Sequence, residues 1–87
     1  MPPFPCTAYF AHIRSRPDRA RIQDEWTVHV IEHPAQRQVQ ADGRIRLWAK
    51  IAAAGDRYLR VILLADGRTV DNAFFDRSAM NKKIGVK

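Results

Sequence analysis

The amino-acid sequence predicts an α+β fold, in which an N-terminal helix packs on one face of a four-stranded antiparallel β-meander. Apolar residues recur about every four positions before Pro34 and every second position after it, which indicates a helix followed by strands. Asp-Gly pairs at residues 42–43 and 66–67 are typical of two-residue hairpin turns. Because short connections join neighbouring strands, we expect these strands to pair antiparallel.

The helix is expected over residues 17–33. Ile22, Trp26 and Val30 are four positions apart, so they would share the face that packs on the sheet. The residues expected to face water are Arg19, Gln23 and Thr27. Pro34 ends the helix, because the residue before a proline resists helical geometry. Trp26 is therefore predicted to lie in the core.

Four strands are expected, over residues 36–41, 44–51, 58–65 and 69–75. The alternate apolar residues of the second and third strands are Ile45, Leu47, Ala49, Ile51, Leu59, Val61 and Leu63. Such alternation places one face of the sheet against the helix and leaves the other open to solvent. A two-residue turn between the last two strands would set Leu63 opposite Val70 and Arg60 opposite Ala73.

The composition describes one small, basic domain over residues 1–87. Fifteen Lys and Arg against nine Asp and Glu give a net charge of +6, which favours a polyanionic partner such as RNA. The 46% of hydrophobic residues is typical of a globular protein. The proline-containing arm at residues 1–8 and the polar tail at residues 81–87 are expected to be poorly ordered.

Several classes of protein are excluded by what the sequence lacks. No apolar run approaches the ~20 residues of a membrane span, and the N-terminus has no secretory signal, so we expect no membrane association and a cytoplasmic location. The single cysteine, Cys6, cannot form an internal disulfide. Together with the three histidines it lacks the spacing of a zinc site, so we expect no metal and no cofactor. The oligomeric state is left open.

Basic and aromatic residues gather on the expected open face of the sheet. This face should present Arg44, Arg46, Trp48, Lys50, Tyr58, Arg60 and Thr69. Guanidinium groups can hold phosphate while aromatic rings stack on unpaired bases. The candidate RNA-binding residues are Arg44, Trp48, Lys50, Tyr58 and Arg77, and Trp48 is therefore expected to be partly exposed. The alternative is that these residues are the solvated side of the sheet and block edge-to-edge aggregation.

Four sequence segments carry a family resemblance. They are residues 40–48 (QADGRIRLW), 58–62 (YLRVI), 66–70 (DGRTV) and 72–77 (NAFFDR). These segments resemble a family of small bacterial proteins of unknown function allied to RelE-like toxins. The wider group, with barnase, EndoU and colicin nucleases, contains metal-independent ribonucleases that pack one or two helices on a four-stranded antiparallel sheet. The resemblance implies a RelE-like fold and the function of a metal-independent ribonuclease or toxin of a bacterial toxin–antitoxin system, with RNA as the substrate and an antitoxin protein as a partner.

Metal-independent RNA cleavage would need a base, an acid and a group that stabilises the phosphate. Arg46 and Arg60 are the candidates for the phosphate, and His12 and Asp76 for the proton transfers. The alternatives are that His12 is a surface residue and that Asp76 forms a local ion pair with Arg77. RelE-like toxins often rely on Arg and Lys instead of a conventional acid and base, so the sequence leaves open whether the chain is an enzyme.

Arg46 and Arg60 are expected to be neighbours on the open face, where together they could chelate one phosphate. The alternative is that they pair with Asp71 or Asp76 on the adjacent strand.

Two other functions use the same features. One is a non-catalytic RNA- or protein-binding module that uses the same basic face. The other is an accessory protein that associates through its apolar surface.

Overall fold

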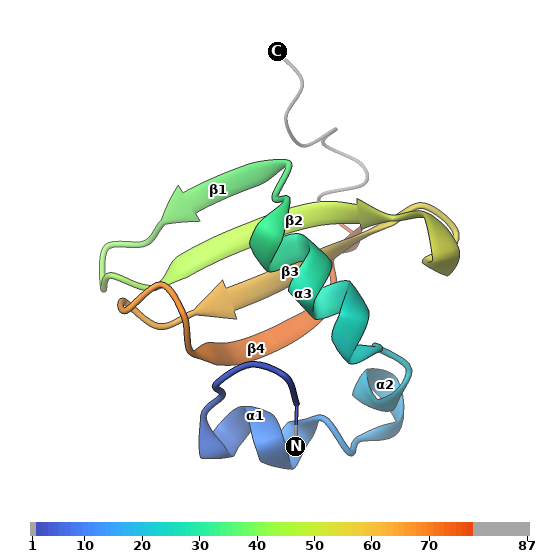
Figure 1. Cartoon of the computed structure of the whole chain (residues 1–87), viewed down its shortest axis with the longest axis horizontal. Coiled ribbons are helices and arrows are strands. Elements are labelled where there is room, and N and C mark those ends of the chain that lie inside the picture. The colour runs from blue at the N-terminus through green and yellow to red at the C-terminus, as the bar shows by residue number, and fades with distance from the viewer. Residues whose placement is uncertain (1, 78–87) are drawn as a thin grey trace.

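The computed structural model describes residues 2–77, and these residues form a four-stranded antiparallel sheet with short helices against one face and at one edge (Figure 1). The strands are β1 (Gln36–Val39), β2 (Ile45–Ile51), β3 (Arg57–Leu63) and β4 (Val70–Phe75). They lie in the order of the sequence and each pairs antiparallel with the next. The predicted α+β class and the meander are therefore confirmed.

The helices are α1 (Ala8–Ile13), α2 (Pro17–Ala20) and α3 (Asp24–Glu32), and a turn of 3₁₀ helix, η1 (Ala52–Ala54), follows β2. The prediction of one helix over residues 17–33 is wrong. Gln23 has extended backbone dihedrals and precedes α3 as its N-cap, so the chain breaks between α2 and α3. This break places Asp24 and Glu25 in the first turn of α3, where their charges favour the helix dipole.

The helix break also changes which residues face the core. Thr27, predicted to face water, is 1% exposed, and Val30 is fully buried, so these two residues define the buried side of α3. Trp26 packs against the core but is only partly buried, and its ring meets that of Phe75 edge-on at a centroid distance of 6.1 Å. Trp26 therefore contacts the core as predicted, but its side chain is not fully buried.

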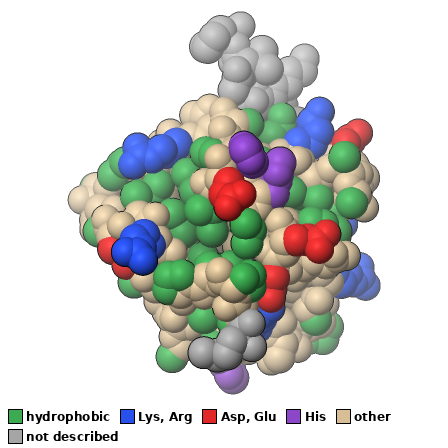
Figure 2. Space-filling view, viewed as in Figure 1, with side chains coloured by type: hydrophobic (Ala, Val, Ile, Leu, Met, Phe, Trp, Pro, Cys, Tyr) green, Lys and Arg blue, Asp and Glu red, His purple; other side chains and the backbone are tan. Residues whose placement is uncertain are grey.

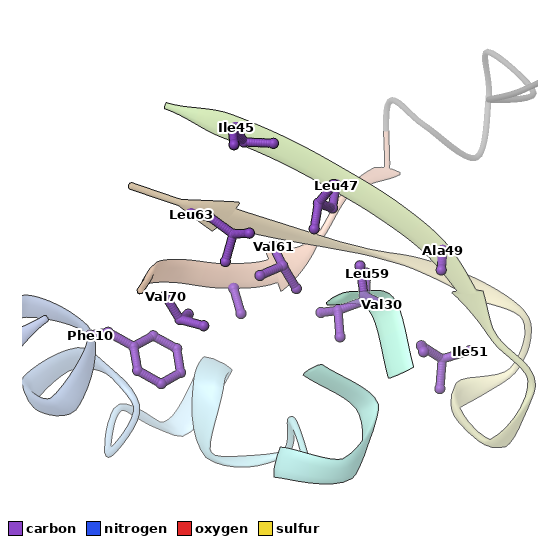
Figure 3. Close-up of a cluster of buried hydrophobic side chains, with 11 residues drawn as sticks. Phe10, Val30, Ile45, Leu47, Ala49, Ile51, Leu59, Val61, Leu63 and Val70 are labelled. Carbon is purple, nitrogen blue, oxygen red and sulfur yellow. The ribbon is translucent and has the colours of Figure 1, made fainter. Parts of the chain in front are cut away.

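The core lies between α3 and the covered face of the sheet, because α3 packs across β2 and β3. Figure 3 shows the apolar side chains of the strands pointing towards the helices. They include the alternate residues predicted for this face, Ile45, Leu47, Ala49, Ile51, Leu59, Val61 and Leu63. Phe10 of α1 and Val30 of α3 close the core from the other side.

A β-bulge in the last hairpin shifts the predicted pairing by one residue. Leu63 lies opposite Val70, as predicted, but the register slips between Ile62 and Leu63, so Arg60 lies opposite Phe74 and not Ala73. A bulge adds one residue to one strand and exchanges the two faces beyond it. Ala73 consequently turns into the core, where it is 2% exposed, and Phe74 turns to the open face.

The N-terminal segment lies along the edge of β4. The backbone N–H of Val70 donates to the carbonyl of Pro5 at 2.9 Å, and the N–H of Thr7 donates to the carbonyl of Val70 at 3.0 Å. These bonds occupy backbone groups at the edge of β4 that could otherwise pair with a strand of another molecule. The tail predicted at residues 81–87 lies outside the described residues. Within residues 2–77 no helix has the length and apolar character needed to cross a membrane.

The turn between β3 and β4 depends on the carboxylate of Asp66. It accepts from the hydroxyl of Thr69 at 2.6 Å, from the N–H of Thr69 at 2.9 Å and from the N–H of Arg68 at 2.8 Å. These bonds, the Thr69 hydroxyl first, lower the pKa of Asp66 from 3.8 to about 2. A depressed pKa means that the charged carboxylate stabilises the fold above pH 4 and that this contribution is lost as the pH falls towards 2.

We therefore expect Asp66→Asn to lower the melting temperature at pH 7, with a difference from the unmodified protein that shrinks as the pH falls from 4 towards 2. Thermal unfolding followed by circular dichroism across this range measures the difference. The Thr69→Val variant keeps the shape of the side chain but removes the strongest donor, so it should flatten the pH dependence. A difference that stays constant from pH 7 to pH 2 would contradict the assigned role of the carboxylate.

Candidate nucleic-acid interface

The open face of the sheet combines basic and aromatic side chains, as predicted. Trp48 lies opposite Arg60, Lys50 opposite Tyr58, and Arg46 opposite Ile62. On the other face, which α3 crosses, the Lys and Arg side chains lie in separate patches towards the margin (Figure 2). The strand register therefore brings the predicted residues of β2 and β3 together on one side of the molecule.

Trp48 is buried, so the prediction that it is partly exposed is wrong. It is 5% exposed, and the guanidinium of Arg60 lies over its ring, 5.1 Å from the centroid. The indole N–H donates to a carboxylate oxygen of Asp76 at 2.9 Å, which satisfies a buried donor. A base could stack on Trp48 only if Arg60 moved away. Trp48 thus serves as support for the arginine and the carboxylate beside it.

The buried carboxylate of Asp76 forms an ion pair with the partly buried Arg60. Its side chain is 7% exposed, and its Oδ2 atom lies 2.5 Å from the guanidinium of Arg60. The backbone N–H of Asp76 donates to the carbonyl of Tyr58 at 2.9 Å, which extends the pairing of β4 with β3. Of the alternatives drawn from the sequence, pairing of Arg60 with Asp76 is the one observed.

Arg46 has a weaker environment than Arg60. It donates to the side-chain oxygen of Gln38 on β1 at 3.5 Å, and it pairs with neither Asp71 nor Asp76 within the described part of the chain. The Nε atoms of Arg46 and Arg60 are both buried and have no hydrogen-bond partner among the described residues, and an unpaired buried donor costs about 1–3 kcal/mol. Joint binding of a phosphate by this pair stays a prediction.

A groove at the edge of the sheet contains more arginine than the open face does. It has a volume of about 380 Å³ and lies between α2 and the end of β4. Its lining residues are Asp18, Arg19, Arg21, Arg57, Phe74, Phe75, Asp76 and Arg77. We call this feature the arginine groove. Of its lining residues, only Asp76 and Arg77 were candidates from the sequence.

Two of the arginines in the groove are held in place by aromatic and polar contacts. Arg19 donates to the side chain of Asn72 at 2.7 Å, and its guanidinium lies 5.3 Å from the ring centroid of Phe74. Arg57 donates through Nε to the carbonyl of Ala54 at 2.8 Å, and its guanidinium lies 4.1 Å from the ring centroid of Phe75. Such stacking positions the guanidinium groups and leaves terminal N–H donors for a ligand.

The charge balance of the groove favours an anion. Four arginines face two carboxylates, and both carboxylates are occupied, since Asp76 pairs with Arg60 and Asp18 lies 3.4 Å from Arg19. The exposed side chains of Arg21 and Arg77 form no hydrogen bond or ion pair with the residues that the structure describes. Converging guanidinium groups repel one another unless an anion lies between them.

His12 and Asp76 are not brought together. α1 begins beside Val70, at the end of β4 opposite Asp76, and His12 is exposed on this helix. Among residues 2–77 no hydrogen bond or ion pair joins His12 to Arg46, Arg60 or Asp76. The base and acid proposed for RNA cleavage therefore do not form a pair in this structure.

The remaining predicted residues lie near the ends of the strands. Arg44 precedes β2 and lies 3.9 Å from Asp42 and 3.7 Å from Asp71, so two carboxylates already neutralise it. Lys50 is exposed at the end of β2, opposite the half-buried Tyr58. Lys50 and Tyr58 are thus at the same end of the sheet as the arginine groove.

Comparison with protein-family models, curated proteins and solved structures found no match to this chain. The resemblance to RelE-like proteins therefore rests on the four sequence segments.

The buried ion pair predicts unequal effects of two similar substitutions. Asp76→Asn should lower the free energy of unfolding by roughly 3 kcal/mol, because it leaves the charge of Arg60 unpaired. Asp18→Asn is the matched control, since the exposed Asp18 lies 3.4 Å from Arg19, and it should cost less than about 1 kcal/mol. Urea unfolding measures both values. Equal losses in the two variants would mean that the pair with Arg60 contributes no more than a surface ion pair.

Proposed function

We propose that this protein binds single-stranded RNA through the arginine groove and acts as a binding module. The observation that carries the proposal is the convergence of Arg21, Arg57 and Arg77 on one groove whose two carboxylates are already paired. Guanidinium groups bind phosphate through two parallel hydrogen bonds, which makes arginine well suited to a nucleic-acid backbone. The net charge of +6 would attract a polyanion from a distance.

Three features favour RNA in single-stranded form. The groove is small, so it suits one extended strand and not a duplex. Tyr58 and Lys50 lie opposite each other at the same end of the sheet, where a ring and a cation can hold the nucleotides that leave the groove. The resemblance to RelE-like proteins also implies RNA, and an RNA ligand agrees with the expected cytoplasmic location.

The geometry favours binding over cleavage. In the conventional mechanism an acid and a base reach the same phosphate, and within residues 2–77 no hydrogen bond or ion pair joins the exposed His12 to Asp76. The carboxylate of Asp76 already accepts from Trp48 and Arg60. Cleavage by a toxin that an antitoxin neutralises would instead depend on the Arg and Lys side chains, as the resemblance to RelE-like toxins implies.

We expect a fluorescein-labelled ten-nucleotide RNA to bind with an affinity that falls steeply with salt, as fluorescence anisotropy would show. Each phosphate contact to a single strand contributes about −0.7 to the slope of log K against log [salt]. Arg21→Gln and Arg77→Gln should each weaken binding several-fold and reduce this slope by about 0.7. Gel electrophoresis of the same RNA after incubation should show it intact.

Arg37→Gln is the matched control. Arg37 is an exposed arginine on β1, at the opposite edge of the sheet from the groove, so its loss removes the same charge without touching the site. If Arg37→Gln weakened RNA binding as much as the groove variants do, net charge alone would explain the affinity. This result would contradict binding at the arginine groove. Competition by polyglutamate at the same charge concentration would indicate an acidic protein as the partner, and shortened RNA on the gel would indicate a nuclease.

A further inference from the structure

The arginine groove is small in proportion to its charge. Its volume of about 380 Å³ lies near the lower end of the range for small-molecule pockets. Within this space three guanidinium groups, those of Arg21, Arg57 and Arg77, are not neutralised by a carboxylate of the described chain. A single internal phosphodiester carries one negative charge and would leave most of this positive charge unmatched.

On the side of the sheet, the groove is bounded by an ion pair that is already neutralised. Asp76 forms part of its lining, and the side chain of Asp76 is buried between Arg60 and Trp48. Trp48 and Asp76 are less than a tenth exposed, so neither offers a surface to a ligand on that side. An RNA strand that continued past Asp76 would meet the guanidinium of Arg60, whose charge Asp76 already neutralises.

The excess of positive charge in the groove and its boundary at Asp76 both favour the end of an RNA strand. A phosphate monoester carries a charge of about −1.5 to −2 at pH 7 and three strong acceptor oxygens. Arg57, fixed over Phe75 with its Nε bonded to Ala54, offers terminal N–H donors at a defined position. Arg21, just after α2, and Arg77, just after β4, line the same space, so that three guanidinium groups are available to these oxygens.

We propose that the arginine groove binds a terminal phosphate monoester of single-stranded RNA, in preference to an internal phosphodiester. This inference rests on the proposed function, since it names the part of the RNA that the same groove holds. The nucleotides next to the terminal phosphate then pass over Tyr58 and Lys50 at the adjoining end of the sheet.

The test compares three eight-nucleotide RNAs of one sequence with an internal fluorescent base. One carries a 5′-phosphate, one carries a 3′-phosphate, and one ends in hydroxyl groups at both ends. We expect at least one phosphorylated RNA to bind about tenfold tighter than the hydroxyl-ended RNA, which corresponds to one additional charge-assisted interaction. Arg77→Gln should abolish this preference, whereas Arg37→Gln should preserve it.

Different failures have different meanings. Equal affinity of all three RNAs, with binding still weakened in Arg77→Gln, would overturn the terminal-phosphate inference and leave RNA binding by the groove intact. Absence of binding by every RNA at low salt would overturn the proposed function itself. Adenosine monophosphate should compete more weakly than the phosphorylated RNA, and equally strong competition would overturn the inference in favour of a free nucleotide.

Discussion

The carboxylate of Asp76 joins three strands on the side of the sheet away from α3. It lies just beyond β4 and accepts from Trp48 on β2 and from Arg60 on β3. Because a buried carboxylate needs a cationic partner, this contact fixes Arg60 over the Trp48 ring. The centre of the open face is consequently occupied by the protein's own cation, and the arginines that remain available for an anion lie at the edge, in the arginine groove.

The bulge between β3 and β4 determines which side chains reach that edge. It sets Phe74 opposite Arg60 and turns Ala73 into the core, so an aromatic ring and not a methyl group supports the guanidinium groups of Arg19 and Arg60. With the uninterrupted register expected from the turn alone, Phe74 would belong to the covered face. One additional residue in the strand therefore changes the candidate site as well as the core.

The strands could be predicted from the sequence because their signals are local. Alternating apolar residues and two Asp-Gly turns are present in the chain itself, and they specify the faces of β2 and β3. The break at Gln23 could not be predicted, because the residues around it continue a helical pattern, and the position of Arg19 and Arg21 depends on that break. The burial of Trp48 was missed because alternation gives the direction of a side chain and not what its neighbours cover.

Binding of RNA in the arginine groove is tested most directly by NMR titration of the ¹⁵N-labelled protein with a phosphorylated single-stranded RNA. The resonances to follow are the Nε–H groups of Arg21, Arg57 and Arg77, the indole N–H of Trp48, and the backbone amides of the turn at Asp66. We predict saturable shifts of the arginine and Trp48 signals, because Trp48 is bonded to a residue of the groove. The turn, at the other end of the sheet, should be unaffected. Shifts confined to β1, or an equal response of all exposed arginines, would contradict binding of RNA in the arginine groove.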